Sequence, residues 1–309
     1  MNSHPQTAEV VGFGMLTPVA ILVVDQLPEH NTGALIKTVS EFIFDDAAIV
    51  ACVLRQWDVQ TGMIGTMLGN DARGRDLARK LKALGVLGKV RFSKHITTPY
   101  EVDISDLTGA RTYFWERHPH ILATLDTADL SLLHGAHMLY VDWYDGDHIL
   151  RATDEAIRLG VPVFLNLEHG HIEPDKLERY VRRATICQAV TDPAQRGDHD
   201  PLVVAKKLLN EGAQTALITL AGEGCLAADR SRVVRAWPPK IKVVDGCGAG
   251  ATFSAGFIYG YLHGMDLVES VRFATVAAAL KVACAGLEMA PIDTIKALAE
   301  KIRVEVTAW

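Results

Sequence analysis

The residues best suited to chemistry lie in one glycine-rich stretch, residues 243–257, with the sequence VVDGCGAGATFSAGF. Its first residues are typical of a strand and its last of an apolar helix. At such a junction the free N–H groups of the first helical turn and the positive end of the helix dipole face outward, and glycines let the backbone approach an anion closely. The stretch therefore predicts an anion site, although a tight turn that needs only small residues would give the same pattern.

Acidic residues follow the apolar run 138–141, at the expected carboxyl edge of the sheet. They are Asp142, Asp145 and Asp147. Open α/β proteins bind ligands at this edge, and an acidic solvated turn is the alternative interpretation. The segment 168–171, Glu-His-Gly-His, has metal-ligating residue types, but neither an HExxH nor a CxxC pattern accompanies it, so we expect no metal site.

Two arginines and one cysteine are further candidates. Arg111 and Arg117 flank an aromatic run, where they would either face an anionic group of a ligand or charge an exposed strand edge. Cys247 lies inside the glycine-rich stretch, close to the expected start of the helix, where the helix dipole would lower the pKa of its thiol. A small packed side chain is the alternative for Cys247.

The glycine-rich stretch resembles the D-T-x-G-A-G-D signature of ribokinase-like (PfkB) kinases, which an apolar helix carrying A-G-F follows. In that family G-A-G forms the anion hole for the transferring phosphate, and the final Asp takes the proton of the acceptor hydroxyl. The resemblance implies an anion hole at Gly248, Ala249 and Gly250, with Asp245 as the first Asp on the nucleotide side. The position of the base holds Ala251, whose side chain cannot accept a proton.

The resemblance extends over most of the chain. Similar segments are the opening strand 11–14, the helix start 47–52, the strand 61–65, the turn 69–75, the lid strand 112–114 and the adenine-flanking helix 277–282. It implies a three-layer α/β/α fold with a mostly parallel sheet and a small β lid, and ATP and Mg²⁺ as cofactors. The residues that it places at the nucleotide are Thr219, Gly222, Gly224 and Thr275.

Several other functional positions of the family hold unsuitable residues. Val19 stands in place of a sugar-binding Asp, and Val-Thr-Asp-Pro at 190–193 in place of the N-x-x-E motif. The residues that the resemblance places at the substrate are Asp45, Asp46, Ile49 and Arg111. The two carboxylates replace a Gly-Gly hinge and would repel a phosphorylated product, and the isoleucine replaces an Asn that binds the acceptor hydroxyl.

Two functions are compatible with these departures. General-base assistance contributes about 10²–10⁴ to a rate, so an active enzyme needs another acid, such as Asp46, in the place of the missing base. It would transfer a phosphate from ATP to a hydroxyl of a sugar, nucleoside or related polyol. The alternative is a catalytically inactive pseudokinase that serves as a nucleotide-binding, regulatory or structural subunit. A carboxylate installed at Ala251 would discriminate between the two.

Composition limits the partners. The 309 residues carry a net charge of −6 without a run of Lys or Arg, which argues against nucleic acid and against an anionic membrane surface. Five scattered cysteines without a CxxC pair are typical of reduced thiols, and the polar first residues do not resemble a signal peptide, so we expect a cytoplasmic protein. A small-molecule sugar or nucleoside is the expected partner, and the family resemblance adds a possible homodimer through the lid.

The elements that must position these residues follow from the spacing of apolar residues. Short runs alternate with helical segments from residue 138 to 220, which predicts βαβ units and a parallel sheet. Residues 90–116, rich in Thr and aromatic residues with Gly109 between two runs, predict a strand, a turn and a strand. We expect helices at 47–57, 76–84 and 291–301, and one domain over residues 1–309 with lid strands roughly at 19–44 and 90–117.

Overall fold

Nine strands of the described chain form a mostly parallel central sheet. The computed structural model describes residues 7–107, 110–191 and 199–309. In order across the sheet the strands are β15 (Val304–Ala308), β14 (Arg232–Ala236), β13 (Cys225–Ala228), β12 (Thr215–Thr219), β11 (Ile186–Val190), β10 (Val163–Glu168), β9 (Met138–Asp142), β1 (Val10–Gly14) and β4 (Thr61–Gly65). The strands from β4 to β12 pair in parallel, and β13 to β15 continue the sheet in antiparallel order.

Helices cover both faces of this sheet because consecutive strand residues point to opposite sides. Val10 belongs to one apolar cluster and Val11 to the other. The first cluster takes in α1 (Asp46–Gln56), α2 (Ala72–Leu84), α8 (Ala249–Leu262), α9 (Leu267–Lys281) and α10 (Ile292–Ala299). The second takes in α4 (Leu150–Leu159), α5 (Pro174–Tyr180) and α7 (Pro201–Glu211). The predicted three-layer α/β/α fold with a mostly parallel sheet is confirmed.

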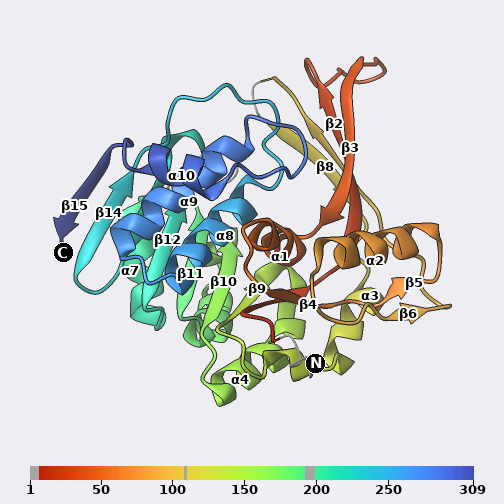
Figure 1. The fold of residues 1–309 in the computed structure, drawn as a ribbon, viewed down its shortest axis with the longest axis horizontal. Helices are drawn as coiled ribbons and strands as arrows, with labels where there is room; N and C mark the ends of the chain where they lie inside the picture. Colours follow the sequence, from red (N-terminus) through yellow and green to blue (C-terminus); the bar gives the residue numbers. More distant parts are fainter. Residues whose placement is uncertain (1–6, 108–109, 192–198) are drawn as a thin grey trace, which may run out of the picture.

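A second, four-stranded sheet rises beside the central one (Figure 1), and we call it the lid. Its order is β3 (Ile36–Phe44), β2 (Thr17–Val24), β7 (Glu101–Ser105) and β8 (Arg111–Trp115). The central pair, β2 with β7, is parallel, so the lid joins two segments that lie far apart in the sequence. The short strands β5 (Leu68–Gly69) and β6 (Phe92–Ser93) pair separately below it.

Short helical segments connect the larger elements. They are α3 (Pro119–Leu122), η1 (Ala123–Thr127), η2 (Ser131–Leu133), η3 (Trp143–Ile149), η4 (His169–Ile172), η5 (Val181–Arg183) and η6 (Ala221–Glu223). In the part of the chain that the structure describes, no helix has the length and apolar character needed to cross a bilayer.

Two boundaries differ from the sequence-based expectation. Helix α2 begins at Ala72 rather than at residue 76, because the Asp71 carboxylate accepts a hydrogen bond from Gly74 N at 2.8 Å and caps the helix earlier. Strand β15 was not expected, because its five residues, VEVTA, are mostly exposed and gain their pairing only from β14. The expected turn at Gly109 lies outside the described residues.

Candidate active site

A cavity of about 150 Å³ lies between the lid and the carboxyl edge of the central sheet. The lid contributes Glu101, Asp103, Arg111, Tyr113 and Trp115. The junction of β3 with α1 contributes Phe44, Asp45 and Asp46. The remaining lining residues are Arg117, Tyr144, Glu168, His169, Gly248, Gly250 and Ala251. The glycine-rich loop, the two hinge aspartates and Arg111 thus meet in one place, as the sequence analysis expects.

The glycine-rich loop is held from behind by a fully buried ion pair. Lys281 Nζ lies 2.9 Å from Asp245 Oδ2, and neither side chain is exposed. Asp245 Oδ1 accepts hydrogen bonds from Ser105 Oγ at 2.8 Å and from Cys247 N at 2.9 Å. Asp245 therefore fixes the loop to α9 and to the lid, and it does not line the cavity.

The loop leads directly into α8. Gly248, with φ of 74°, is the N-cap of this helix, and no side chain caps the helix there. A Cβ atom added at Gly250 would meet nothing closer than Glu168 Oε1 at 4.0 Å. The backbone of this first turn is consequently open to the cavity, which is what an anion needs.

The first turn of α8 provides neither an acid nor a free hydroxyl. Ala251 lines the cavity, and no acidic residue lies in the turn. Thr252 is buried and its Oγ1 donates a hydrogen bond to Gly248 O at 2.8 Å, so it points away from the cavity. Cys247 is packed beneath the loop, and burial raises the pKa of its thiol well above the usual range, so the expected lowering of that pKa is wrong and Cys247 is a small packed side chain.

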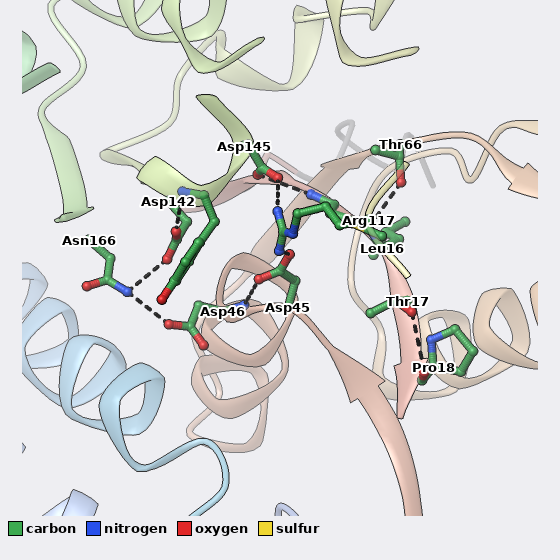
Figure 2. Close-up of polar contacts among 12 residues, drawn as sticks. Leu16, Thr17, Pro18, Asp45, Asp46, Thr66, Arg117, Asp142, Asp145 and Asn166 are labelled. Atoms are coloured by element: carbon green, nitrogen blue, oxygen red, sulfur yellow. Dashed lines mark hydrogen bonds and ion pairs between the residues drawn. The ribbon is translucent and has the colours of Figure 1, made fainter. Parts of the chain in front are cut away.

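Three carboxylates surround the amide of Asn166, and Figure 2 shows two of them, Asp46 and Asp142. Asn166 Nδ2 lies 2.9 Å from Asp46 Oδ2, 2.8 Å from Asp142 Oδ2 and 3.0 Å from Glu168 Oε1. An amide nitrogen has two hydrogens and cannot serve three acceptors. Burial, followed by the charges of Glu168 and Asp45, raises the pKa of Asp46 to about 8, and burial, followed by the charge of Asp46, raises that of Asp142 well above its usual range. At neutral pH the Asp46 and Asp142 carboxyl groups are therefore shifted toward their protonated forms.

Arg117 ties the hinge of the lid to the central sheet (Figure 2). Its guanidinium bonds the Asp45 carboxylate and, at 2.8 Å, Asp145 Oδ1. Burial, followed by the charge of Asp45, raises the pKa of Asp145 to about 7 although Arg117 opposes the rise. Asp45 and Glu168 have positive φ angles of 59° and 45°, in a region that favours glycine. Two side chains of the cavity are thus held on strained backbone.

The comparison with known protein families identifies the chain. Residues 46–294 match the family described as pfkB family carbohydrate kinase. The chain belongs to this family. A relative that aligns over nearly the whole chain is the 1-phosphofructokinase of Haemophilus influenzae, 24% identical over 90% of this chain and 91% of its own length.

Other similarities are more local or concern the fold alone. An uncharacterized sugar kinase of Archaeoglobus fulgidus is 39% identical, but the match spans only 26% of this chain and 32% of that protein. Among solved structures, a microbiome-derived acarbose kinase has a TM-score of 0.79 at 22% identity, with 96% of this chain and 100% of that chain covered. Ribokinase from Thermotoga maritima has a TM-score of 0.75 at 19% identity, with 95% and 100% covered. These structures show that the pfkB chain has the ribokinase-like fold.

Not all residues expected at the site of this pfkB chain reach the cavity. Within the described residues, Ala249 is not part of the lining, and Ile49 and Val19 are buried in apolar clusters behind it. Asp192 and Pro193, expected in place of the N-x-x-E motif, lie outside the described residues. Over the described ranges no group of three or more His, Cys, Asp and Glu side chains has the geometry of a metal site.

The residues expected at the nucleotide lie apart from the cavity lining. Thr219 ends β12, and Gly222 and Gly224 belong to the turn that follows it. Gly224 has φ of 89°, and a Cβ atom there would lie 2.2 Å from Ala236 O, so this turn needs glycine. Thr275 is buried in α9, where its Oγ1 donates a hydrogen bond to Val271 O at 2.7 Å.

Sequence reasoning missed two acids of the lid, Glu101 and Asp103. Both lie on β7, whose buried positions are Glu101, Asp103 and Ser105, while Val102 and Ile104 are only half-buried. A lid strand that turns its polar side chains inward reverses the usual alternation. The sequence EVDIS carries this alternation, but it does not say which of the two faces is covered.

Proposed function

We propose that this pfkB-family protein is an ATP-dependent kinase that phosphorylates a hydroxyl of a small sugar, nucleoside or related polyol, with Asp46 as the general base. The observation that carries the proposal is the position of the Asp46 carboxyl group. It lines the same cavity as Gly248, Gly250 and Ala251, and its pKa of about 8 suits a group that exchanges protons near neutral pH.

In the proposed reaction the ionised form of Asp46, a minor fraction at neutral pH, accepts the proton of the acceptor hydroxyl. The hydroxyl oxygen bonds the phosphorus of the terminal phosphoryl group as the bond between that group and ADP breaks. The uncapped N–H groups at the start of α8 would stabilise the negative charge of the transferring group. Arg117 and Asn166 position the carboxylates of the cavity from behind.

The backbone of the glycine-rich loop can accommodate a phosphate group. Because an acidic side chain lies beside the loop, a phosphate would bind there only together with a cation. The backbone at Gly250 is open, but Glu168 Oε1 would lie 4.0 Å from a Cβ atom at that position. Mg²⁺ bound to phosphates takes one or two protein carboxylates, and Glu168 is the carboxylate placed to hold it. The ion would neutralise charge on the phosphates; within the described residues no other acid lies as near to Gly250.

Backbone strain supports the view that the cavity binds a ligand and has not lost its function. Asp45 and Glu168, with φ of 59° and 45°, both line it. Such conformations cost about 1–3 kcal/mol each and cluster at functional sites. A cavity without a ligand would gain stability from glycine at either position.

A pseudokinase is the second candidate, and the first turn of α8 favours it. No acid is present in that turn, so the ordinary position of the base contributes nothing. In this case the cavity would bind its ligands without turnover, and Asp46 would be one member of a structural carboxyl cluster.

The test is ATP turnover against a panel of sugars, nucleosides and polyols, followed by the Asp46→Asn variant. We expect the variant to lose about 10²–10⁴ in kcat while it keeps the wild-type affinity for ATP. Glu178→Gln, on the exposed side of α5, is the matched control and should leave turnover unchanged. Wild-type binding of ATP without turnover of any acceptor, together with turnover created by Ala251→Asp, would establish the pseudokinase instead.

A further inference from the structure

Strand β7 turns two carboxylates into the cavity from the lid. Glu101 is 7% exposed and Asp103 is fully buried, and they lie on one face because they are two residues apart. Ser105, next on that face, donates its hydrogen bond to Asp245 beneath the glycine-rich loop. The polar face of the strand therefore runs along the cavity toward the anion hole.

These two carboxylates are poorly neutralised by the protein. Asp103 Oδ2 lies 3.5 Å from Arg111 Nη1, a long contact, and Oδ1 has no hydrogen-bond partner within the described residues. The weakly donating Cys247 thiol also lies near this carboxyl group. For the Glu101 side chain, the described part of the chain offers no ion pair and no hydrogen bond. Arg117, the other cation of the lining, already bonds Asp45 and Asp145.

Unpaired buried carboxylates are costly, and proteins keep them where a cation or a proton compensates them. Burial, followed by the charges of Asp45 and Asp103, raises the pKa of Glu101 to about 8. The protein thus compensates part of the negative charge of the cavity with protons. A bound cation would do so instead and would release those protons.

Aromatic rings complete the same side of the cavity. The rings of Tyr113 and Trp115 on β8 stack with their centroids 4.8 Å apart, and Tyr144 lies on the opposite wall. Aromatic faces attract ammonium groups, with the strongest effect for Trp. Arg111 already lies over the Tyr113 ring, 5.9 Å from its centroid, and Arg117 over the Tyr144 ring at 5.6 Å. Of these three rings, Trp115, which pairs with Glu101 across the two strands, is the one that no cation of the described residues covers.

We propose that the acceptor of this kinase carries a protonated amine beside its hydroxyls, as an amino sugar or an aminopolyol does. The ammonium group would lie between Glu101 and Asp103 under Trp115, which leaves a hydroxyl to reach Asp46. The role of the bound molecule as a phosphate acceptor rests on the proposed function. The amine site itself does not depend on it. The same carboxylates disfavour a phosphorylated acceptor.

The test is calorimetric titration without ATP, with matched pairs of probes. The pairs are D-glucosamine with D-glucose and 1-amino-1-deoxy-D-sorbitol with D-sorbitol, and glucose 6-phosphate is the anionic probe. We expect the amine to bind about tenfold or more tightly than its neutral partner in at least one pair, and the phosphate not to bind. Equal affinities within both pairs, or no binding of either amine at millimolar concentration, would overturn the inference.

Variants that remove a negative charge and a variant that removes a positive charge separate an effect of charge on amine binding from a general loss of structure. Glu101→Gln and Asp103→Asn should each reduce the preference for the amine about tenfold, whereas Arg111→Gln, which removes a positive charge, should increase it. Glu178→Gln is the matched exposed control and should change nothing. If all three cavity variants weaken the binding of the amine and of its neutral partner by the same factor, the site does not discriminate by charge and the inference fails.

Three further outcomes keep the proposals distinct. Mg²⁺ that binds tightly without ATP, is lost in Glu101→Gln and Asp103→Asn, and excludes both amines would show that β7 holds a metal, which overturns the inference. Selective amine binding without ATP turnover would support the amine site and refute the proposed kinase. Turnover of neutral and amine acceptors with equal kcat/KM would support the kinase and refute the amine site.

Discussion

Replacing Asp46 by asparagine tests the electrostatics of the carboxyl cluster without any assumption about a ligand. Asparagine has nearly the same shape, carries no charge, and its carbonyl oxygen can still accept the hydrogen bond that Asn166 Nδ2 donates at 2.9 Å. The wild-type group is half-buried beside Glu168 and Asp45, and burial followed by these two charges raises its pKa from 3.8 to about 8. The variant therefore removes a group that native folding forces to keep its proton.

The sign and size of the effect follow from linkage. Between pH 5 and pH 7 the native Asp46 carboxyl group keeps a proton that the unfolded chain has lost, so the free energy of unfolding falls as pH rises. One such group lowers the free energy of unfolding by about 1.4 kcal/mol per pH unit, or by about 2–3 kcal/mol over this range. Because the charge of Asp46 also raises the pKa of the neighbouring Asp142, this figure is an upper value. Asp46→Asn should thus gain stability relative to the wild type by up to that amount from pH 5 to pH 7.

The assay is urea unfolding of both proteins at pH 5, 6 and 7, compared as the difference between variant and wild type at each pH. Taking the difference cancels the other titrating groups. Glu178→Gln, an exposed carboxylate, should show a difference that does not depend on pH. A pH-independent difference for Asp46→Asn, or one that shifts in favour of the wild type as pH rises, would refute the assignment of a raised pKa to Asp46.

Three other perturbations have clear expected results. Lys281→Met leaves the Asp245 carboxylate buried without its cation and should lower the free energy of unfolding, measured in urea, by about 3–5 kcal/mol. Adding Asp245→Asn should restore a part of this loss. An unchanged urea midpoint in Lys281→Met would contradict the role of the pair. Gly224→Ala should destabilise by more than about 1 kcal/mol, while Gly222→Ala, whose Cβ atom would meet nothing within 4 Å, should not. We also propose that the lid pairs two copies through the outer face of β3, where Val39 is 59% exposed. Light scattering should then report a wild-type dimer and a Val39→Asp monomer, and a monomeric wild type would contradict the pairing.

The anion site and the layered fold could be read from the sequence because both depend on local patterns. The glycines before α8 set the backbone of the loop whatever surrounds them, and the alternating runs from β9 to β12 specify parallel pairing. The hinge aspartates were found only through their resemblance to a family motif. The physical effect of Asp45 comes from the Arg117 guanidinium, which it shares with Asp145 and which lies more than seventy positions later in the chain.

The acids of β7 could not be assigned from the sequence, because a strand with alternating residue types has two faces and the fold decides which is covered. Val102 and Ile104 would ordinarily take the covered face. Likewise, Asp245 has the residue type of a ligand-binding group, and only the buried Lys281 and Ser105 around it show that it supports the loop. Non-local partners decided the outcome in both cases.

The ion pairs of Arg117 have a consequence for the rate at which the lid opens. Arg117 follows the lid strand β8, and its guanidinium bonds Asp45, where β3 enters α1, and Asp145, beyond β9. A pair of glycines would let β3 swing freely, but here the end of β3 and the segment after β8 are fastened to the body at one point. The lid should therefore open as a unit and only when both ion pairs break, so that release of the product, rather than the chemical step, would set the rate of each cycle.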